Sequence, residues 1–212
     1  MKQIKTLEEI VNDVDSKLDD KDTVRELAFK SSRAVRRLSR KIIQSIHRGE
    51  NPRDTMQEAL EEVAKVKSIV EGHVELYHSG FLRNGFQELA EAHILWSISQ
   101  KKEPKPPEEL DITPASYLLG LADVVGELRR MVLNELDNGD VEKAKELLDK
   151  MERIKDMILE FDYPKAIVPL RNKQDVARNL VEKTRGDLTN SIQNEKLMEK
   201  MDELMENIEE NK

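Results

Sequence analysis

The residues of this chain best suited to chemistry are two pairs of carboxylates at helical spacing. Glu88 and Glu91 are three positions apart in FQELAEA, and Asp123 and Glu127 are four apart in GLADVVGE. On an α-helix, either spacing places both members of a pair on one face. The surrounding residues are mostly apolar, where an isolated charge is costly to bury. A divalent cation that prefers oxygen ligands, Mg²⁺ or Mn²⁺, would balance this charge and support hydrolysis.

A solvated acidic face is the alternative interpretation of each pair. Around the second pair, however, residues 115–132 are nearly all apolar, so these acids interrupt a helix that otherwise reads as buried. Gly120 and Gly126 beside them leave small positions where another backbone or a ligand can come close. Ferritin-like di-iron chemistry needs Glu-x-x-His, whereas His93 lies off the face of the acids. Hydrolysis with magnesium is therefore favoured over iron redox chemistry.

A basic segment precedes the acidic pairs. Between Lys21 and Arg48 there are nine Lys or Arg and two acids, a net +7 in a chain whose total is −8. Opposite an apolar series, its basic side chains follow helical spacing: Arg33, Arg36, Arg37, Arg40 and Lys41. Guanidinium groups donate forked hydrogen bonds that suit phosphate oxygens. The pattern predicts a phosphate-binding surface, and a solvated face that pairs with the acidic remainder of the protein is the alternative.

The elements that must position these residues read as helices. Of the 212 residues, 37% are charged and 4% aromatic, which is typical of long amphipathic helices. The apolar spacing and capping residues predict helices over 22–48, 51–77, 86–99, 113–138 and 140–161, then one through Leu170 and Leu180, with QKKEPKPPEEL as an exposed loop. The expected fold is all-α, an antiparallel bundle of about seven long helices without a sheet. Residues 1–190 read as one domain and 191–212 as an acidic C-terminal helix or frayed tail.

Several classes of function are disfavoured by composition. The chain has no cysteine, which removes disulfides, zinc-thiolate sites and thiol catalysis. Its four histidines lack the spacing of a zinc site, and no glycine-rich loop supports ATP or NAD use. The first twenty residues lack the apolar core of a signal peptide, and no later stretch approaches the ~20 apolar residues that span a membrane. We therefore expect a cytoplasmic protein without a membrane partner.

Three segments together resemble the translin and translin-associated factor X family: GFQELAEA, ITPASYLLGLADVVGELRRMVLNELDNGD and YPKAIVPLRNKQDVARNLVEKTRGDL. The resemblance covers residues 23 to 188, and YLLGLADVVGE is its most specific part. Members of this family are seven-helix bundles that form hollow octamers and bind RNA or single-stranded DNA on the inner surface. In the translin-associated factor X branch, four acidic residues hold magnesium and cut RNA. The motif places those roles on Glu88, Glu91, Asp123 and Glu127, and the acid at 123 favours this catalytic branch.

The resemblance thus implies a metal-dependent endoribonuclease that cleaves single-stranded RNA inside a hollow homo-oligomer, expected to be a homo-octamer. The basic helix would hold RNA or single-stranded DNA. Two alternatives stay open. One is a translin-like protein that binds RNA or DNA without catalysis. The other is an all-α nucleoside-triphosphate pyrophosphohydrolase, because these enzymes also arrange Glu-x-x-Glu and a later acidic pair around magnesium.

Overall fold

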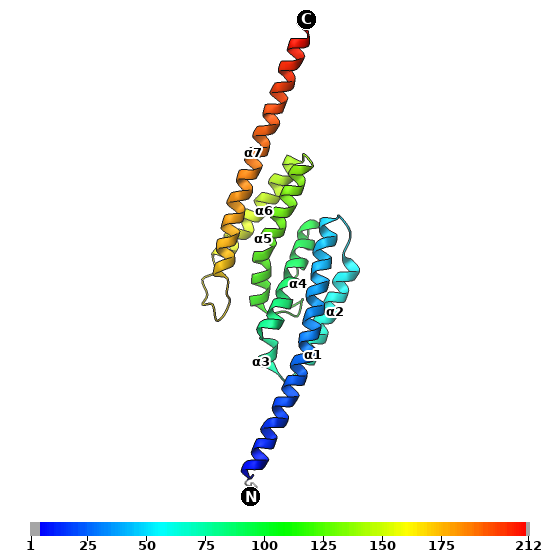
Figure 1. Ribbon diagram of the computed structural model, residues 1–212, viewed down its shortest axis with the longest axis vertical. Helices are drawn as coiled ribbons and strands as arrows, with labels where there is room; N and C mark the ends of the chain where they lie inside the picture. The colour runs from blue at the N-terminus through cyan, green and yellow to red at the C-terminus, as the bar shows by residue number, and fades with distance from the viewer. Residues whose placement is uncertain (1–4, 211–212) are drawn as a thin grey trace. The chain divides into compact units, whose positions relative to one another are not determined.

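The computed structural model describes residues 5–210, which form seven α-helices and no strand (Figure 1). They are α1 (Leu7–His47), α2 (Arg53–Ile69), α3 (Val74–Tyr77), α4 (Gly80–Ser99), α5 (Pro114–Asp137), α6 (Val141–Leu159) and α7 (Arg171–Glu210). The predicted all-α class is confirmed. The chain divides into two compact units, Met1–Gly120 and Leu121–Lys212, and the division falls inside α5. None of the helices in the described part of the chain is long and apolar enough to cross a membrane.

The first helix is longer than predicted, because it begins at Leu7 rather than near Asp22. Thr6 and Glu9 form a capping box. The Thr6 hydroxyl accepts from the Glu9 backbone N–H at 3.3 Å, and the Glu9 carboxylate accepts from the Thr6 N–H at 2.7 Å. The added turns carry apolar side chains that are all exposed: Leu7, Ile10, Val11, Val14 and Leu18. Because these apolar side chains are exposed, a helix prediction that relies on a buried apolar face does not include this segment.

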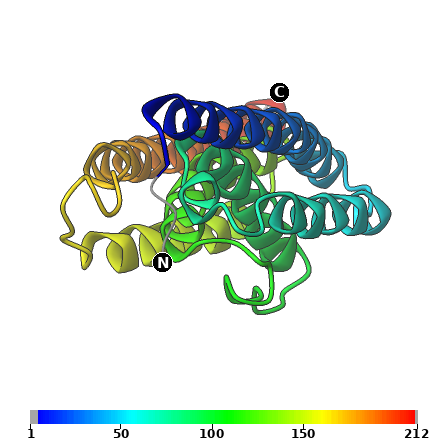
Figure 2. The same ribbon diagram turned by 90° about the horizontal axis from the view of Figure 1, so that it is seen from below.

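In the first unit, α1 packs against both α2 and α4 (Figure 2). The core of this unit comes from the apolar stripe of each helix, including Val35 and Ile42 of α1, Val63 of α2, and Phe86 and Leu89 of α4, all at most 1% exposed. These stripes follow the 3.6-residue period that the sequence shows. The acidic pair of α4 is consequently held against α1, the helix that carries the basic residues.

The helix predicted over 51–77 is two helices. α2 ends at Ile69, and Gly72, at φ 86°, adopts a left-handed conformation that favours glycine. The single-turn α3 follows. α4 then begins at Gly80 rather than at Phe86.

The proline-rich connection between α4 and α5 is less exposed than predicted. Leu110 is 1% exposed and Ile112 is 5% exposed. Near the middle of the connection, the backbone N–H of Lys105 donates to Nε2 of the buried His93 at 3.1 Å. The connection is therefore anchored on α4 and returns the chain to the beginning of that helix.

In the second unit, α6 packs against α7. Asp140 caps α6 as predicted, since its carboxylate accepts from the Lys143 backbone N–H at 2.9 Å. At the other end of α6, Gln174 Nε2 donates to the carbonyls of Ile158 and Phe161, both at 2.8 Å, and ties the connecting loop to α7. α7 is one helix of 40 residues, so the boundary predicted at residue 190 lies inside a continuous helix.

Candidate metal centre and phosphate-binding surface

The first acidic pair lies half-buried on α4, where Glu88 faces α1. Arg36 Nε donates to Glu88 Oε1 at 2.8 Å, and the Glu88 side chain is 20% exposed. Arg40 Nε lies 3.3 Å from Oε2, at ion-pair distance, but that buried oxygen accepts no hydrogen bond from the described residues. An ion pair without a hydrogen bond leaves the lone pairs of Oε2 undirected. Glu88 is thus neutralised by two arginines and keeps one oxygen with unused acceptor capacity.

Gly120 holds the start of α5 against α4 at the first acidic pair. A Cβ at this position would lie 2.6 Å from the Gln87 carbonyl oxygen, 2.7 Å from the Ala90 Cβ and 2.8 Å from the Glu91 backbone nitrogen. The Ser116 hydroxyl, one turn earlier in α5, donates to the Arg83 carbonyl at 3.3 Å. The backbone of α4 therefore lies so close to Gly120 that a side chain would not fit there. This confirms the close approach of another backbone that the sequence predicted at this glycine.

The second acidic pair, Asp123 and Glu127, lies half-buried on α5. Lys173, in the first turn of α7, donates to Asp123 Oδ1 in an ion pair, and both side chains are about one quarter exposed. Gly126 has no close backbone neighbour, since an added Cβ there would meet only Leu180 Cδ1 at 3.9 Å. The close approach predicted at Gly126 is therefore not found within this unit.

Next to the second pair, Arg129 joins α5 to α7. Its guanidinium donates to the Thr184 hydroxyl at 2.7 Å and lies 2.8 Å from an Asp187 carboxylate oxygen. The Arg129 side chain is 14% exposed, so these contacts are shielded from water. They fix the part of α5 that carries the acids relative to α7.

The donor chemistry of the two pairs fits a hard divalent cation. All four side chains are carboxylates, and Glu88 Oε2 is a buried acceptor without a hydrogen-bond donor among the described residues. Within 5–210, neither unit taken alone contains a group of three or more His, Asp or Glu arranged to hold a metal. Glu88 and Glu91 belong to the first unit, and Asp123 and Glu127 belong to the second.

His93, two residues after Glu91, has a structural role. It is 5% exposed and its Nε2 accepts the Lys105 N–H described above. Burial, with a smaller effect from the Lys105 charge, lowers its pKa from 6.5 to about 4. The ring is therefore neutral at physiological pH.

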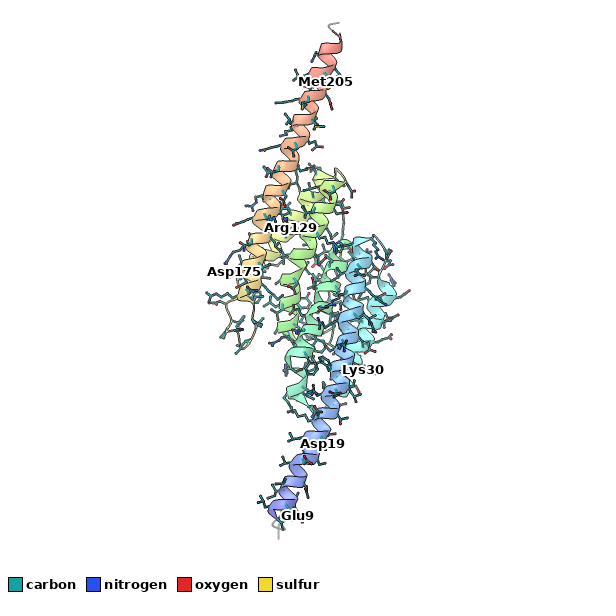
Figure 3. All side chains as sticks on the ribbon, in the orientation of Figure 1. Glu9, Asp19, Lys30, Arg129, Asp175 and Met205 are labelled. Carbon is teal, nitrogen blue, oxygen red and sulfur yellow. The ribbon has the colours of Figure 1, made fainter. Side chains whose placement is uncertain are left out.

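The predicted basic residues form one face of α1, bordered by an open groove of about 930 Å³. Besides the five predicted cations, the groove is lined by Lys30 (labelled in Figure 3) and by the half-exposed Leu27 and Phe29. Arg33, Arg37 and Lys41 are exposed and form no ion pair with any residue in 5–210.

Arg36 and Arg40 behave differently from the rest of this face, because they pair with Glu88. The alternative of a basic face that pairs with acidic residues is therefore correct for these two residues. Arg33, Arg37 and Lys41 are exposed cations that have no acidic partner among the described residues, and these suit an external anion.

Lys173 is the functional candidate that sequence reasoning missed. It is 50 residues from Asp123, and nothing in its spacing separates it from an ordinary surface lysine. The one feature of the sequence that pointed to a role for Lys173 is its place in the segment YPKAIVPLRNKQD, which carries part of the family resemblance.

Comparison with known proteins establishes the family. A sequence model described as the Translin family matches residues 23–185, and this chain belongs to that family. An uncharacterised protein of Methanocaldococcus jannaschii is 36% identical over 184 residues, covering 86% of this chain and 82% of that protein. Translin-associated protein X of Rattus norvegicus is 45% identical over a shorter match of 47 residues, which covers 22% of this chain and 16% of that protein.

Solved structures agree with this assignment. The structure of an AfC3PO–duplex RNA complex has a TM-score of 0.76 at 33% identity, covering 85% of this chain and 95% of that chain. The crystal structure of AfC3PO alone gives a TM-score of 0.77 at 34% identity, covering 85% and 96%. That of apo-NeC3PO, at 20% identity, shares the fold with a TM-score of 0.75, covering 89% and 100%.

Proposed function

We propose that this protein binds RNA and is a metal-dependent endoribonuclease that cleaves single-stranded RNA. The observation that carries the proposal is that both acidic pairs are half-buried and lie beside cationic side chains. Each pair is half-buried on one helical face, and both Glu88 and Asp123 are paired with cations that also suit phosphate. The similarity to AfC3PO, whose structure was solved with duplex RNA, supports RNA as the ligand.

The proposed ligands of Mg²⁺ or Mn²⁺ are Glu88, Glu91, Asp123 and Glu127. The cation would supply Lewis-acid stabilisation of the negative charge that develops on the phosphodiester during hydrolysis. The oxygen-only donor set favours these hard cations over zinc or iron.

The cationic side chains have two proposed roles. Arg36, Arg40 and Lys173 neutralise carboxylates now, and would turn to substrate phosphates when those carboxylates hold a cation. The exposed cations of α1, Arg33 and Arg37 among them, would hold flanking phosphates along the groove. Contacts of this kind bind the backbone, so sequence selectivity should be weak and single-stranded DNA should also bind.

Water, rather than the ribose 2′-hydroxyl, is the proposed nucleophile. The products should then carry a 5′-phosphate and a 3′-hydroxyl. Cleavage is proposed to take place inside a hollow homo-oligomer, a homo-octamer as the family resemblance implies, in the cytoplasm. An enclosed site would restrict the substrate to strands that can enter.

A non-catalytic RNA-binding protein is the second candidate, and one observation favours it. Glu88 and Asp123 already have cationic partners, so their charge is balanced without a metal. The third possibility, a nucleoside-triphosphate pyrophosphohydrolase, loses its support because the chain belongs to the Translin family.

The decisive experiment follows end-labelled single-stranded RNA with the full chain in Mg²⁺ or in EDTA. Asp123→Asn removes the charge while keeping the side-chain shape, and should reduce Mg²⁺-dependent cleavage at least about 100-fold, as expected for loss of a metal ligand. Asp137→Asn, an exposed acid at the end of the same helix, is the matched control and should cleave like wild type. RNA binding, measured in EDTA, should be retained by both variants.

Each result separates the candidates. Cleavage by Asp123→Asn at the wild-type rate would remove the proposed site. RNA binding by the wild type without cleavage in Mg²⁺ or Mn²⁺ would establish the non-catalytic alternative. Cleavage that persists in EDTA would show that no divalent cation is involved.

A further inference from the structure

The last part of α7 exposes a continuous apolar stripe. Residues 193–207, named here the C-terminal arm, extend past α6 within the second unit (Figure 1), and Figure 3 shows Met205 on this extension. The apolar side chains of the arm are between 51% and 62% exposed: Leu197, Met198, Met201, Leu204 and Met205. A stripe of this size on one helix is unusual for a surface that contacts only water.

The arm lies outside the part of the chain that the family shares. The match to the Translin family covers residues 23–185 and ends before the arm begins. The stripe is therefore not explained by the common fold, nor does the proposed RNA site use it.

The spacing of the stripe is that of a coiled coil. Leu197, Met201 and Leu204 are separated by four and three residues, the alternation of d and a positions in a heptad. Met198 and Met205 then fall at e positions. In this register, the remaining flanking g positions are Gln193, Lys200 and Asn207, none of which is acidic.

The acidic residues of the arm all lie away from this seam. The arm contains five acids at the outer b, c and f positions: Glu195, Glu199, Asp202, Glu203 and Glu206. Two arms of like charge can pair only if their acids do not face each other across the seam. The arm satisfies that condition, although one third of its residues are acidic.

We propose that the C-terminal arm pairs with the same arm of a second copy of this chain as a parallel, in-register, two-stranded coiled coil. Asn194, at the first a position, identifies a second copy as the partner. In such a coil, one Asn194 faces another and their amides can hydrogen-bond, a device that specifies register and favours two strands. A wholly apolar partner surface would instead leave this amide unpaired.

The other exposed stripe of the chain fits the arm less well. In the N-terminal turns of α1, the heptad formed by Leu7, Val11 and Val14 has Glu8 and Asp15 at its e positions. Pairing with this segment would bring acids to the seam beside an acidic arm. The negative charge of the arm likewise disfavours nucleic acid and anionic membranes as partners.

The absence of cysteine allows a direct test by single-cysteine cross-linking of the full chain. Leu197→Cys, Met201→Cys and Leu204→Cys place a thiol on the seam. Glu199→Cys and Glu206→Cys place it at outer positions of the same arm. A disulfide requires Cα atoms about 4.4 to 6.8 Å apart, a distance that facing seam positions in a parallel coil approach and outer positions do not.

Each of the three seam variants should form interchain disulfides with itself, at least about tenfold faster than either outer variant under mild oxidation. The outer controls lie on the same exposed arm, so they correct for disulfides that form by random collision between chains. Circular dichroism checks that every variant remains helical. The measurement does not depend on nuclease activity, so it stands or fails apart from the proposed function.

Three results would overturn the proposal. Equal cross-linking of seam and outer variants would mean contact without a coiled coil. Cross-linking only between Leu197→Cys and Leu204→Cys in a mixture would mean antiparallel pairing. Cross-linking of Met201→Cys only to a Val14→Cys variant would mean that the N-terminal turns are the partner.

Discussion

Gly120 and Gly126 lie on one helix, six residues apart, and the structure predicts opposite effects of the same substitution. At Gly120, a Cβ would meet two backbone atoms of α4, the Gln87 oxygen at 2.6 Å and the Glu91 nitrogen at 2.8 Å. At Gly126, it would meet only a flexible side-chain carbon at 3.9 Å, an ordinary van der Waals contact. Alanine should therefore destabilise the protein at the first position and stabilise it at the second.

The magnitudes follow from two terms. Alanine is favoured over glycine inside a helix by about 1 kcal/mol at both positions. Overpacking a core costs about 1–3 kcal/mol in general. At Gly120 we expect a cost of about 3 kcal/mol, because the colliding atoms belong to the backbone and cannot rotate away. The net expectation is a loss of about 2 kcal/mol for Gly120→Ala and a gain of about 1 kcal/mol for Gly126→Ala.

Thermal and denaturant unfolding followed by circular dichroism measures both effects, at a fixed protein concentration in EDTA so that association and metal binding do not contribute. For a chain of this size, about 1 kcal/mol corresponds to a Tm shift of roughly 2–4 °C. Gly120→Ala should lower Tm by about 4–8 °C and Gly126→Ala should raise it by about 2–4 °C. Equal shifts of the same sign for both variants would refute the close packing of α5 against α4 at Gly120.

Two further predictions concern the buried histidine and the basic face. Because the pKa of His93 is about 4 when folded and about 6.5 when unfolded, its stabilising contribution is complete above pH 6.5 and is lost as pH falls towards 4. The unfolding free energy should fall by about 3 kcal/mol over that range, and His93→Gln should remove most of this dependence in denaturant titrations. For the basic face, replacing Arg33 and Arg37 with Ala should reduce the slope of log Kd against log salt for single-stranded RNA by about 1.4, since each phosphate contact on a single strand contributes about 0.7. Arg178→Ala, which removes a cation paired with an acid on α7, should leave the slope unchanged; a double variant with the wild-type slope would contradict a role for α1 in phosphate binding.

The sequence predicted the helical class and the local setting of the acids, because both depend on periodicity and capping over short distances. Pro114 at the start of α5 and the Asp140 cap of α6 are where their residue types indicate. The start of α1 was missed because helix prediction from apolar periodicity relies on burial, and the stripe that includes Leu7 is exposed. A capping box at Thr6 was the available signal.

The pairing of the acids with cations could not be predicted in the same way. Arg36 and Glu88 are 52 residues apart, and their 2.8 Å contact depends on how α1 rotates against α4. That rotation is set by the packing of side chains such as Phe86, which helical spacing alone does not fix. Sequence reasoning therefore identified both the acids and the arginines, but assigned them to separate surfaces.

The contact between these two groups changes how the first acidic pair should respond to a metal. Arg36 and Arg40 both lie at ion-pair distance from Glu88, so two guanidinium groups balance the charge of this one carboxylate. A divalent cation bound by Glu88 would compete with the two guanidinium groups for the carboxylate oxygens and leave those groups able to donate to phosphate. In the proposed site a cation would stabilise negative charge and would free the arginines for the substrate, whereas acids without cationic partners would repel the substrate until a cation was bound. The arginine pairing therefore favours RNA binding that strengthens with Mg²⁺, against the weakening that simple ionic screening would cause.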